Sequence, residues 1–89
     1  MNNLTPSVNN PFDIVRITEH ENLGVHATTI SRMAIGYILS GKKYIYNNDQ
    51  CREIGEGSLF VLDPGFHYEE NTVAANGRFE QIIFFLILL

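Results

Sequence analysis

The chain has 89 residues, a formal net charge of −4, 45% apolar residues and a single cysteine. A chain of this length forms one domain at most, and its apolar and aromatic content excludes intrinsic disorder. Its ten acidic residues outnumber its six basic ones, which argues against direct nucleic-acid binding, because phosphate neutralisation needs a clustered basic surface.

The N-terminal stretch, residues 1–12, is polar, rich in Asn and interrupted by Pro6 and Pro11. This composition predicts an arm that precedes the folded domain, which we place at residues 13–89. No basic segment followed by an apolar segment begins the chain, so we expect no secretion signal. The lone Cys51 cannot form an internal disulfide, which suits a reducing compartment, and we expect a cytoplasmic protein.

The first half of the domain predicts two strands. Residues 14–17 read as a short strand, and residues 18–26 read as a loop. Residues 28–39 are the clearest candidate for a long strand, because large side chains alternate there with small ones. We expect the large set to face the core and Gly36 to mark the close approach of another backbone. The large set consists of Met33, Ile35, Tyr37 and Leu39.

The middle of the chain predicts a hairpin. Residues 40–42 form a bend around Gly41, and residues 43–46 form the next strand. The run Asn47-Asn48-Asp49 tolerates left-handed backbone and therefore predicts a turn. The partner strand returns over residues 50–54.

The stretch from Gly55 to His67 organises the remaining chain. A glycine turn precedes residues 58–62, which we expect to be a strand buried on both faces, and Asp63-Pro64-Gly65 ends that strand. Residues 68–77 read as a polar excursion, and residues 78–89 as the last strand. Its apolar part, residues 82–89, is too short for a membrane helix. Several short strands at close spacing and no helical periodicity predict an all-β sandwich or barrel.

The residues capable of chemistry give little support for an enzyme. A metal site could draw on three histidines and nearby glutamates, but no His-x-His pair places two ligands on one strand face. We therefore expect no metal and no cofactor. The sequence contains no nucleophile elbow and no phosphate-binding glycine pattern. The residues considered as metal ligands are His20, His26, His67, Glu69, Glu70 and Glu80.

Two segments together resemble the N-terminal cupin-like domain of AraC-type transcription regulators. They are Tyr37-Ile38-Leu39-Ser40-Gly41 and the stretch from Gly55 to His67. The resemblance covers roughly residues 33–85, with Gly41 at the family's bend, Gly57 at its turn, and Pro64, Gly65 and His67 at its closing turn. Ser58 stands where the family usually has Asp, and the spacing from Gly65 to His67 is one residue shorter than usual.

The resemblance implies an all-β, cupin-like (double-stranded β-helix or jelly-roll) barrel that is incomplete at its C-terminal end. It implies an effector-sensing and dimerisation domain, not an enzyme, that binds a small molecule such as a sugar. DNA would be contacted only through a helix-turn-helix domain outside these residues. Aromatic side chains could line the effector pocket or simply fill the core. The candidate ligand-binding residues are Tyr37, Tyr46, Phe60, His67 and Tyr68.

Two other interpretations remain open at this point. One is a small cupin enzyme, such as a sugar isomerase or epimerase, and the other is a dimerisation module with a filled barrel. The apolar run over residues 82–89 needs cover on both faces of a strand, which favours a homodimer. We expect no membrane partner.

Overall fold

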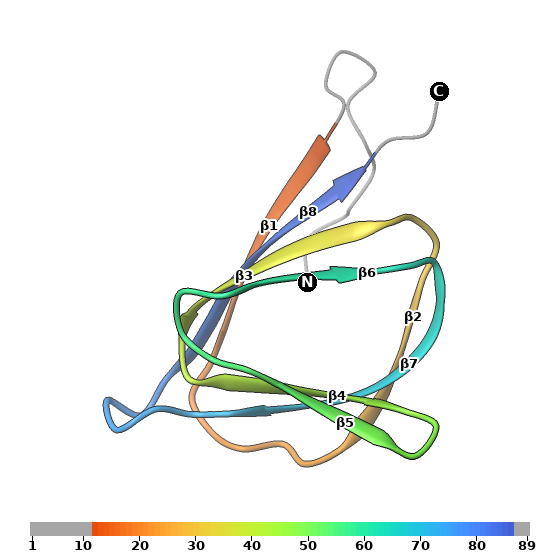
Figure 1. Cartoon of the computed structure of the whole chain (residues 1–89). Helices are drawn as coiled ribbons and strands as arrows, with labels where there is room; N and C mark the ends of the chain where they lie inside the picture. The colour runs from red at the N-terminus through yellow and green to blue at the C-terminus, as the bar shows by residue number, and fades with distance from the viewer. Residues whose placement is uncertain (1–11, 87–89) are drawn as a thin grey trace.

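A computed structural model describes residues 12–86, which form eight antiparallel strands in two four-stranded sheets (Figure 1). The first sheet has the order β1-β8-β3-β6 and the second the order β2-β7-β4-β5. The strands are β1 (Phe12–Glu19), β2 (His26–Ile30), β3 (Ala34–Ser40), β4 (Lys42–Asn47), β5 (Gln50–Ile54), β6 (Leu59–Leu62), β7 (Gly65–Thr72) and β8 (Phe79–Leu86). Within residues 12–86 we find no apolar helix of membrane-spanning length.

The two sheets face each other, and the chain crosses repeatedly from one to the other, as the curved ribbons of Figure 1 show. A small apolar core lies between them. Its buried members are Ala34, Ile38, Ile45, Ile54, Phe60, Leu62 and Phe79. The all-β prediction is confirmed.

The two ends of the described chain lie side by side, because β1 pairs with β8 from Phe12↔Leu86 to Glu19↔Phe79. The first strand is longer than the predicted residues 14–17. The predicted loop over residues 18–26 is shorter than expected, because β1 extends to Glu19 and β2 begins at His26. Phe12, which we assigned to the arm, is the first residue of β1. The rest of the predicted arm lies outside the described residues, as do the last three residues of the predicted final strand.

The prediction of one long strand over residues 28–39 is wrong. The chain bends at Ser31 and Arg32, so β2 joins the second sheet and β3 joins the first. No Gly or Pro marks this bend, but two polar residues fall at it, and the large apolar side chains change phase between Ile30 and Met33. A pattern of alternation reports the local backbone, and it carries no information about which sheet a strand joins.

The expected orientation of β3 is also reversed. The small set of side chains is buried, and the large set, with Ile35 and Tyr37, is half-buried on the other face. Gly36 is indeed closely approached, but by a side chain: a Cβ at this position would overlap the ring of Phe60 on the neighbouring β6. The bulky ring of β6 therefore dictates small residues on the inner face of β3.

The β4–β5 hairpin is confirmed. Asn48 adopts a φ of 54° in the turn, which asparagine tolerates better than most residues. Gly41 has a φ of 85° and coincides with a register shift between Ile38 and Ser40 in the pairing of β3 with β8, which matches the predicted bend.

The strand predicted to be buried on both faces is buried on one. In β6, Phe60 and Leu62 are buried, whereas Leu59 is 66% exposed and Val61 is 51% exposed. The reason is its position, since β6 is an edge strand of the first sheet and nothing among the described residues covers its outer face.

The predicted polar excursion over residues 68–77 is largely a strand. β7 runs from Gly65 to Thr72 in the middle of the second sheet, and its inward side chains Glu69 and Asn71 are buried. A strand with polar residues on its inner face has no apolar alternation, so its sequence cannot be distinguished from that of a loop.

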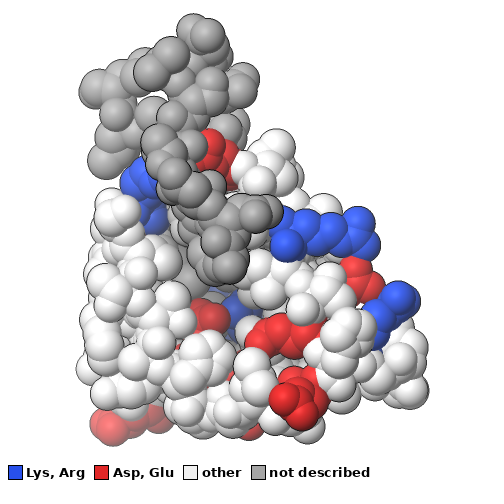
Figure 2. All heavy atoms as spheres, turned by 180° about the vertical axis from the view of Figure 1, so that it is seen from behind, with Lys and Arg blue, Asp and Glu red and all other residues white. Residues whose placement is uncertain are grey.

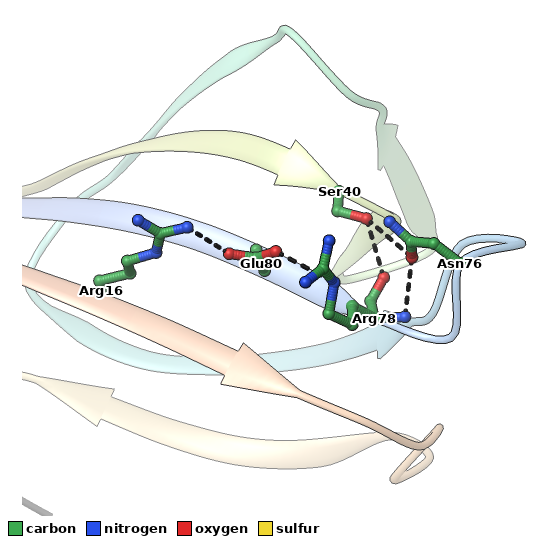
Figure 3. Close-up of polar contacts among 5 residues, drawn as sticks. All are labelled: Arg16, Ser40, Asn76, Arg78 and Glu80. Atoms are coloured by element: carbon green, nitrogen blue, oxygen red, sulfur yellow. Dashed lines mark hydrogen bonds and ion pairs between the residues drawn. The ribbon is translucent and has the colours of Figure 1, made fainter.

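A cluster of polar side chains joins β1, β3 and β8 to the turn that precedes β8 (Figure 3). Arg16 on β1 donates a hydrogen bond to Glu80 on β8 at 2.5 Å, and Arg78 lies 3.3 Å from the other carboxylate oxygen. Ser40 donates to the Arg78 carbonyl at 3.0 Å and to Asn76 Oδ1 at 3.3 Å. The Arg16 hydrogen bond, helped by the charges of both arginines, holds the pKa of Glu80 below its usual value of 4.5.

We expect Gly36→Ala to lower the free energy of unfolding by about 1–3 kcal/mol, because the added methyl group overlaps the Phe60 ring in a packed core. Urea denaturation would measure the loss. Gly55→Ala is the matched control, since a Cβ at Gly55 meets nothing within 4 Å. Equal stabilities for the two variants would contradict the packing described for β3 and β6.

We also expect acid to remove the stabilisation that Glu80 provides. Its pKa is lowered in the folded state, so the unfolded chain binds more protons as the pH falls through this range, and stability falls with it. Denaturant titrations at a series of pH values would show a shallower acid loss for Glu80→Gln than for the wild type. The same slope for both proteins would exclude this contribution.

Candidate functional site

A cavity of about 310 Å³ lies between the two sheets, so the interior is not filled. Five strands from the two sheets, β1, β2, β4, β7 and β8, contribute its polar residues, and residues of the apolar core line the rest of it. The residues that line it are Val15, Ile17, Glu19, His26, Thr28, Thr29, Ile30, Ala34, Lys43, Phe60, Leu62, Glu69, Asn71, Gln81, Ile83 and Phe85.

A buried ion pair stands at the polar end of this cavity. The side chain of Lys43 on β4 is 1% exposed, and its Nζ donates to Glu69 Oε1 on β7 at 3.0 Å. The same ammonium lies 5.4 Å from the Phe60 ring centre and 5.7 Å from that of Phe79, within cation–π range. Burial lowers the pKa of Lys43 from its usual 10.5, although Glu69 opposes this shift.

The same end of the cavity holds a second set of polar contacts that bridges the two sheets. Asn71 Nδ2 on β7 donates to Glu19 Oε1 on β1 at 2.8 Å. His26 Nε2 lies 3.7 Å from Glu69 Oε1, and His26 Nδ1 lies 3.1 Å from the Gly24 carbonyl. The bond to a carbonyl assigns the proton to Nδ1 and turns Nε2 toward the glutamate.

Two amide oxygens in this polar end have no hydrogen-bond partner. They are Asn71 Oδ1 and Gln81 Oε1, on side chains that are 4% and 2% exposed. The bond from Asn71 Nδ2 to Glu19 fixes which way that amide points. A buried polar atom without a partner is costly. Both oxygens are closed to water in this arrangement, so a donor group from a bound molecule would reach them only after their side chains turn.

The five residues predicted to bind the ligand do not form one site. Phe60 lines the interior cavity, whereas Tyr46 and Tyr68 are cross-strand neighbours on the outer face of the second sheet. There they line a shallow surface groove with Phe66, whose ring meets that of Tyr68 edge to face at 5.0 Å.

The two remaining predicted residues lie apart from both places. His67 Nε2 lies 2.7 Å from the carbonyl of Asp63, so its ring braces the turn before β7. Tyr37 is half-buried on β3 opposite Leu59. Tyr46 donates to Glu70 at 2.8 Å, and this bond raises the pKa of Tyr46 to about 12.

Sequence reasoning missed Lys43 and Gln81 as residues of the cavity. A signal for each was present, because Lys43 shares its strand face with buried Ile45, and Gln81 shares its face with buried Phe79. A polar residue in phase with core residues indicates a polar interior site. Among residues 12–86, no group of three or more His, Cys, Asp or Glu side chains is placed to hold a metal ion.

No protein-family model matches the sequence, and no curated protein matches it either. Solved structures do resemble the fold. A cupin superfamily protein from Desulfitobacterium hafniense DCB-2 superimposes with a TM-score of 0.70 at 15% identity, covering 94% of this chain and 72% of its own. A cupin domain from Bordetella pertussis Tohama I gives 0.64 at 9% identity, with 90% and 85% covered.

The EutQ protein of Clostridium difficile superimposes with a TM-score of 0.67 at 13% identity, over 84% of this chain and 56% of its own. The chain thus spans less than two thirds of the EutQ proteins that it resembles, 59% in the case of the Salmonella typhimurium LT2 structure. With two antiparallel sheets and these neighbours, the chain has the cupin fold, as predicted.

We expect Lys43→Met to lower the free energy of unfolding by about 3–5 kcal/mol, because Glu69 would keep a buried charge without its partner. Lys42→Met is the matched control, since Lys42 is exposed and its pair with Glu53 spans 3.7 Å, so we expect a loss below about 1 kcal/mol. Urea denaturation measures both. Similar small losses in the two variants would contradict a buried ion pair.

Proposed function

We propose that this cupin domain is the effector-sensing part of an AraC-type transcription regulator and that the interior cavity binds a small-molecule effector in the cytoplasm. The observation that carries this proposal is the cavity itself, a space between the sheets with buried polar side chains at one end. The motif residues Gly41, Gly57 and Pro64 support the family. A shared fold alone would not, because one fold serves many functions.

In a regulator of this type, binding of the effector must change the structure at a place outside the cavity. Three cavity residues lie on β1 and three on β8, and these strands carry the two ends of the described chain. A ligand that contacts both strands would favour one arrangement of their ends, which is a population shift through differential contacts.

DNA would be bound by a helix-turn-helix domain outside residues 1–89. The face of the molecule in Figure 2 supports this division, because basic and acidic side chains are interspersed on it without a broad basic patch. We expect the coding sequence beyond Leu89 to encode linker helices and a helix-turn-helix. A coding sequence that continues without these elements would contradict the regulator proposal.

An enzyme is the second candidate, in the class of small cupin isomerases or epimerases. One observation favours it: Lys43, with its lowered pKa, stands beside Glu69 within a cavity, and perturbed acid–base groups in clefts are common in active sites. Turnover of a sugar substrate that is abolished in Lys43→Ala while binding persists would favour the enzyme over the regulator.

The binding proposal predicts that filling the cavity abolishes ligand binding. Ile17→Phe adds volume to the cavity wall on β1, whereas Ile14→Phe, the matched control, adds the same ring on the exposed outer face of that strand. A thermal-shift screen of sugars, amines and carboxylates should find a compound that stabilises the wild type and Ile14→Phe only. A ligand at 100 times its Kd adds about 2.7 kcal/mol. A screen in which no compound separates the two variants would contradict the proposal.

We further propose a homodimer through the outer face of the first sheet. Its four strands present apolar side chains there, with Ile14, Leu59 and Val61 more than half exposed. Arg16 and Arg78 both pair with Glu80 on this sheet, so its carboxylate needs no cation from a facing surface. A second copy of this chain can cover the apolar face with its own identical face, related by a two-fold axis.

The double variant Leu59→Lys/Val61→Lys should convert the dimer to a monomer, because it places like charges across the two-fold interface. Sedimentation equilibrium would measure the change. Phe66→Lys is the matched control, since Phe66 is 59% exposed on the other sheet and should leave the dimer intact. A wild-type monomer at high micromolar concentration would refute the dimer.

A further inference from the structure

Acceptor oxygens gather at the polar end of the cavity. Asn71 Oδ1 and Gln81 Oε1 have no donor, and the carboxylates of Glu19 and Glu69 add further acceptor oxygens. The buried Lys43 ammonium is engaged with Glu69 and two aromatic rings. A molecule that donates hydrogen bonds would be stabilised here.

The same end also has an excess of negative charge. The lysine and glutamate side chains that line the cavity are Lys43, Glu19 and Glu69, so two carboxylates share one ammonium. At the other end, Asp13 and Arg32 lie 3.3 Å apart and pair with each other, so they add no net charge. A buried charge is stabilised by an opposite one, which favours a cation over a neutral hydroxyl compound.

The cavity changes from polar to apolar along the direction of β1 and β8. Inward residues along β1 read Glu19, Ile17, Val15, and their partners on β8 read Phe79, Gln81, Ile83. Beyond them Phe85 and Ala34 face each other across β8 and β3, and both line the cavity. A volume of about 310 Å³ lies at the small end of ligand pockets.

We infer that the cavity takes a compact primary amine with an apolar body, whose ammonium group pairs with the Glu19 carboxylate and, once the two amide side chains turn, donates to Asn71 Oδ1 and Gln81 Oε1. The inference rests on the proposed function of the cavity as a small-molecule site and names the class of its ligand. An ammonium group supplies hydrogen-bond donors and a positive charge for the second of the two carboxylates at this end. The apolar body lies against Val15 and Ile83.

The experiment compares three probes of equal length, n-pentylammonium, n-pentanol and pentanoate, at about pH 8, where an imidazole is ordinarily neutral. NMR titration of the full chain gives the Kd of each and maps the residues that shift. We expect n-pentylammonium to bind at least about tenfold more tightly than the other two, with shifts on β1, β7 and β8. Equal or tighter binding of pentanoate or n-pentanol would overturn the amine class.

Two variants make the assignment specific. Gln81→Met keeps the side chain's length and removes the partnerless amide, so the fold should persist, and n-pentylammonium should bind several-fold more weakly. Gln50→Met, on the exposed start of β5, should leave the Kd unchanged. Unchanged affinity in Gln81→Met would overturn the assignment.

These outcomes are separate from the test of the proposed function. If sugars or carboxylates bind the wild type and Ile14→Phe but not Ile17→Phe, the cavity is a ligand site and only the amine class fails. If no compound distinguishes Ile17→Phe from Ile14→Phe, the cavity is not a ligand site, and both proposals fail.

Discussion

The interior of this domain depends on one buried ion pair, between Lys43 of β4 and Glu69 of β7. A charge removed from water needs a close partner, and these two residues can meet because β4 and β7 are neighbours in register, with Ile45 opposite Glu69. Other polar groups lie near the pair: His26 is beside Glu69, and Asn71 donates a hydrogen bond to Glu19. Part of the inner face of the second sheet is therefore polar, beside the apolar Ile45 and Ile54 of the same sheet.

A polar inner face in so small a domain has a physical cost that a purely structural protein would avoid. A chain of about 90 residues buries a modest fraction of its surface, and its stability margin is small. Replacing a buried ion pair by apolar residues of similar volume is often neutral or stabilising. This chain keeps the pair, a cavity and two partnerless amide oxygens together, which supports the proposal that its interior binds a small molecule.

The sequence predicted the parts of the fold that local chemistry controls. The turn at Asn48, the bend at Gly41 and the short strand Gln50–Ile54 all follow from backbone preferences of nearby residues. It failed where a neighbour in space decides the outcome. The large side chains of β3 could not face inward because Phe60 of β6 occupies that space over Gly36, and no residue of β3 itself reports this.

By itself, the sequence determined that this chain is all-β, because short apolar runs separated by turn residues permit little else. It also supplied one of the interior residues, Phe60, through its aromatic character. Tertiary structure alone decided that Lys43, Glu69 and Gln81 share one cavity, since they come from three strands far apart in the chain. It also placed Tyr46 and Tyr68 on the outer face. The reason is that side-chain alternation fixes which residues share a face, whereas only strand pairing fixes whether that face looks inward.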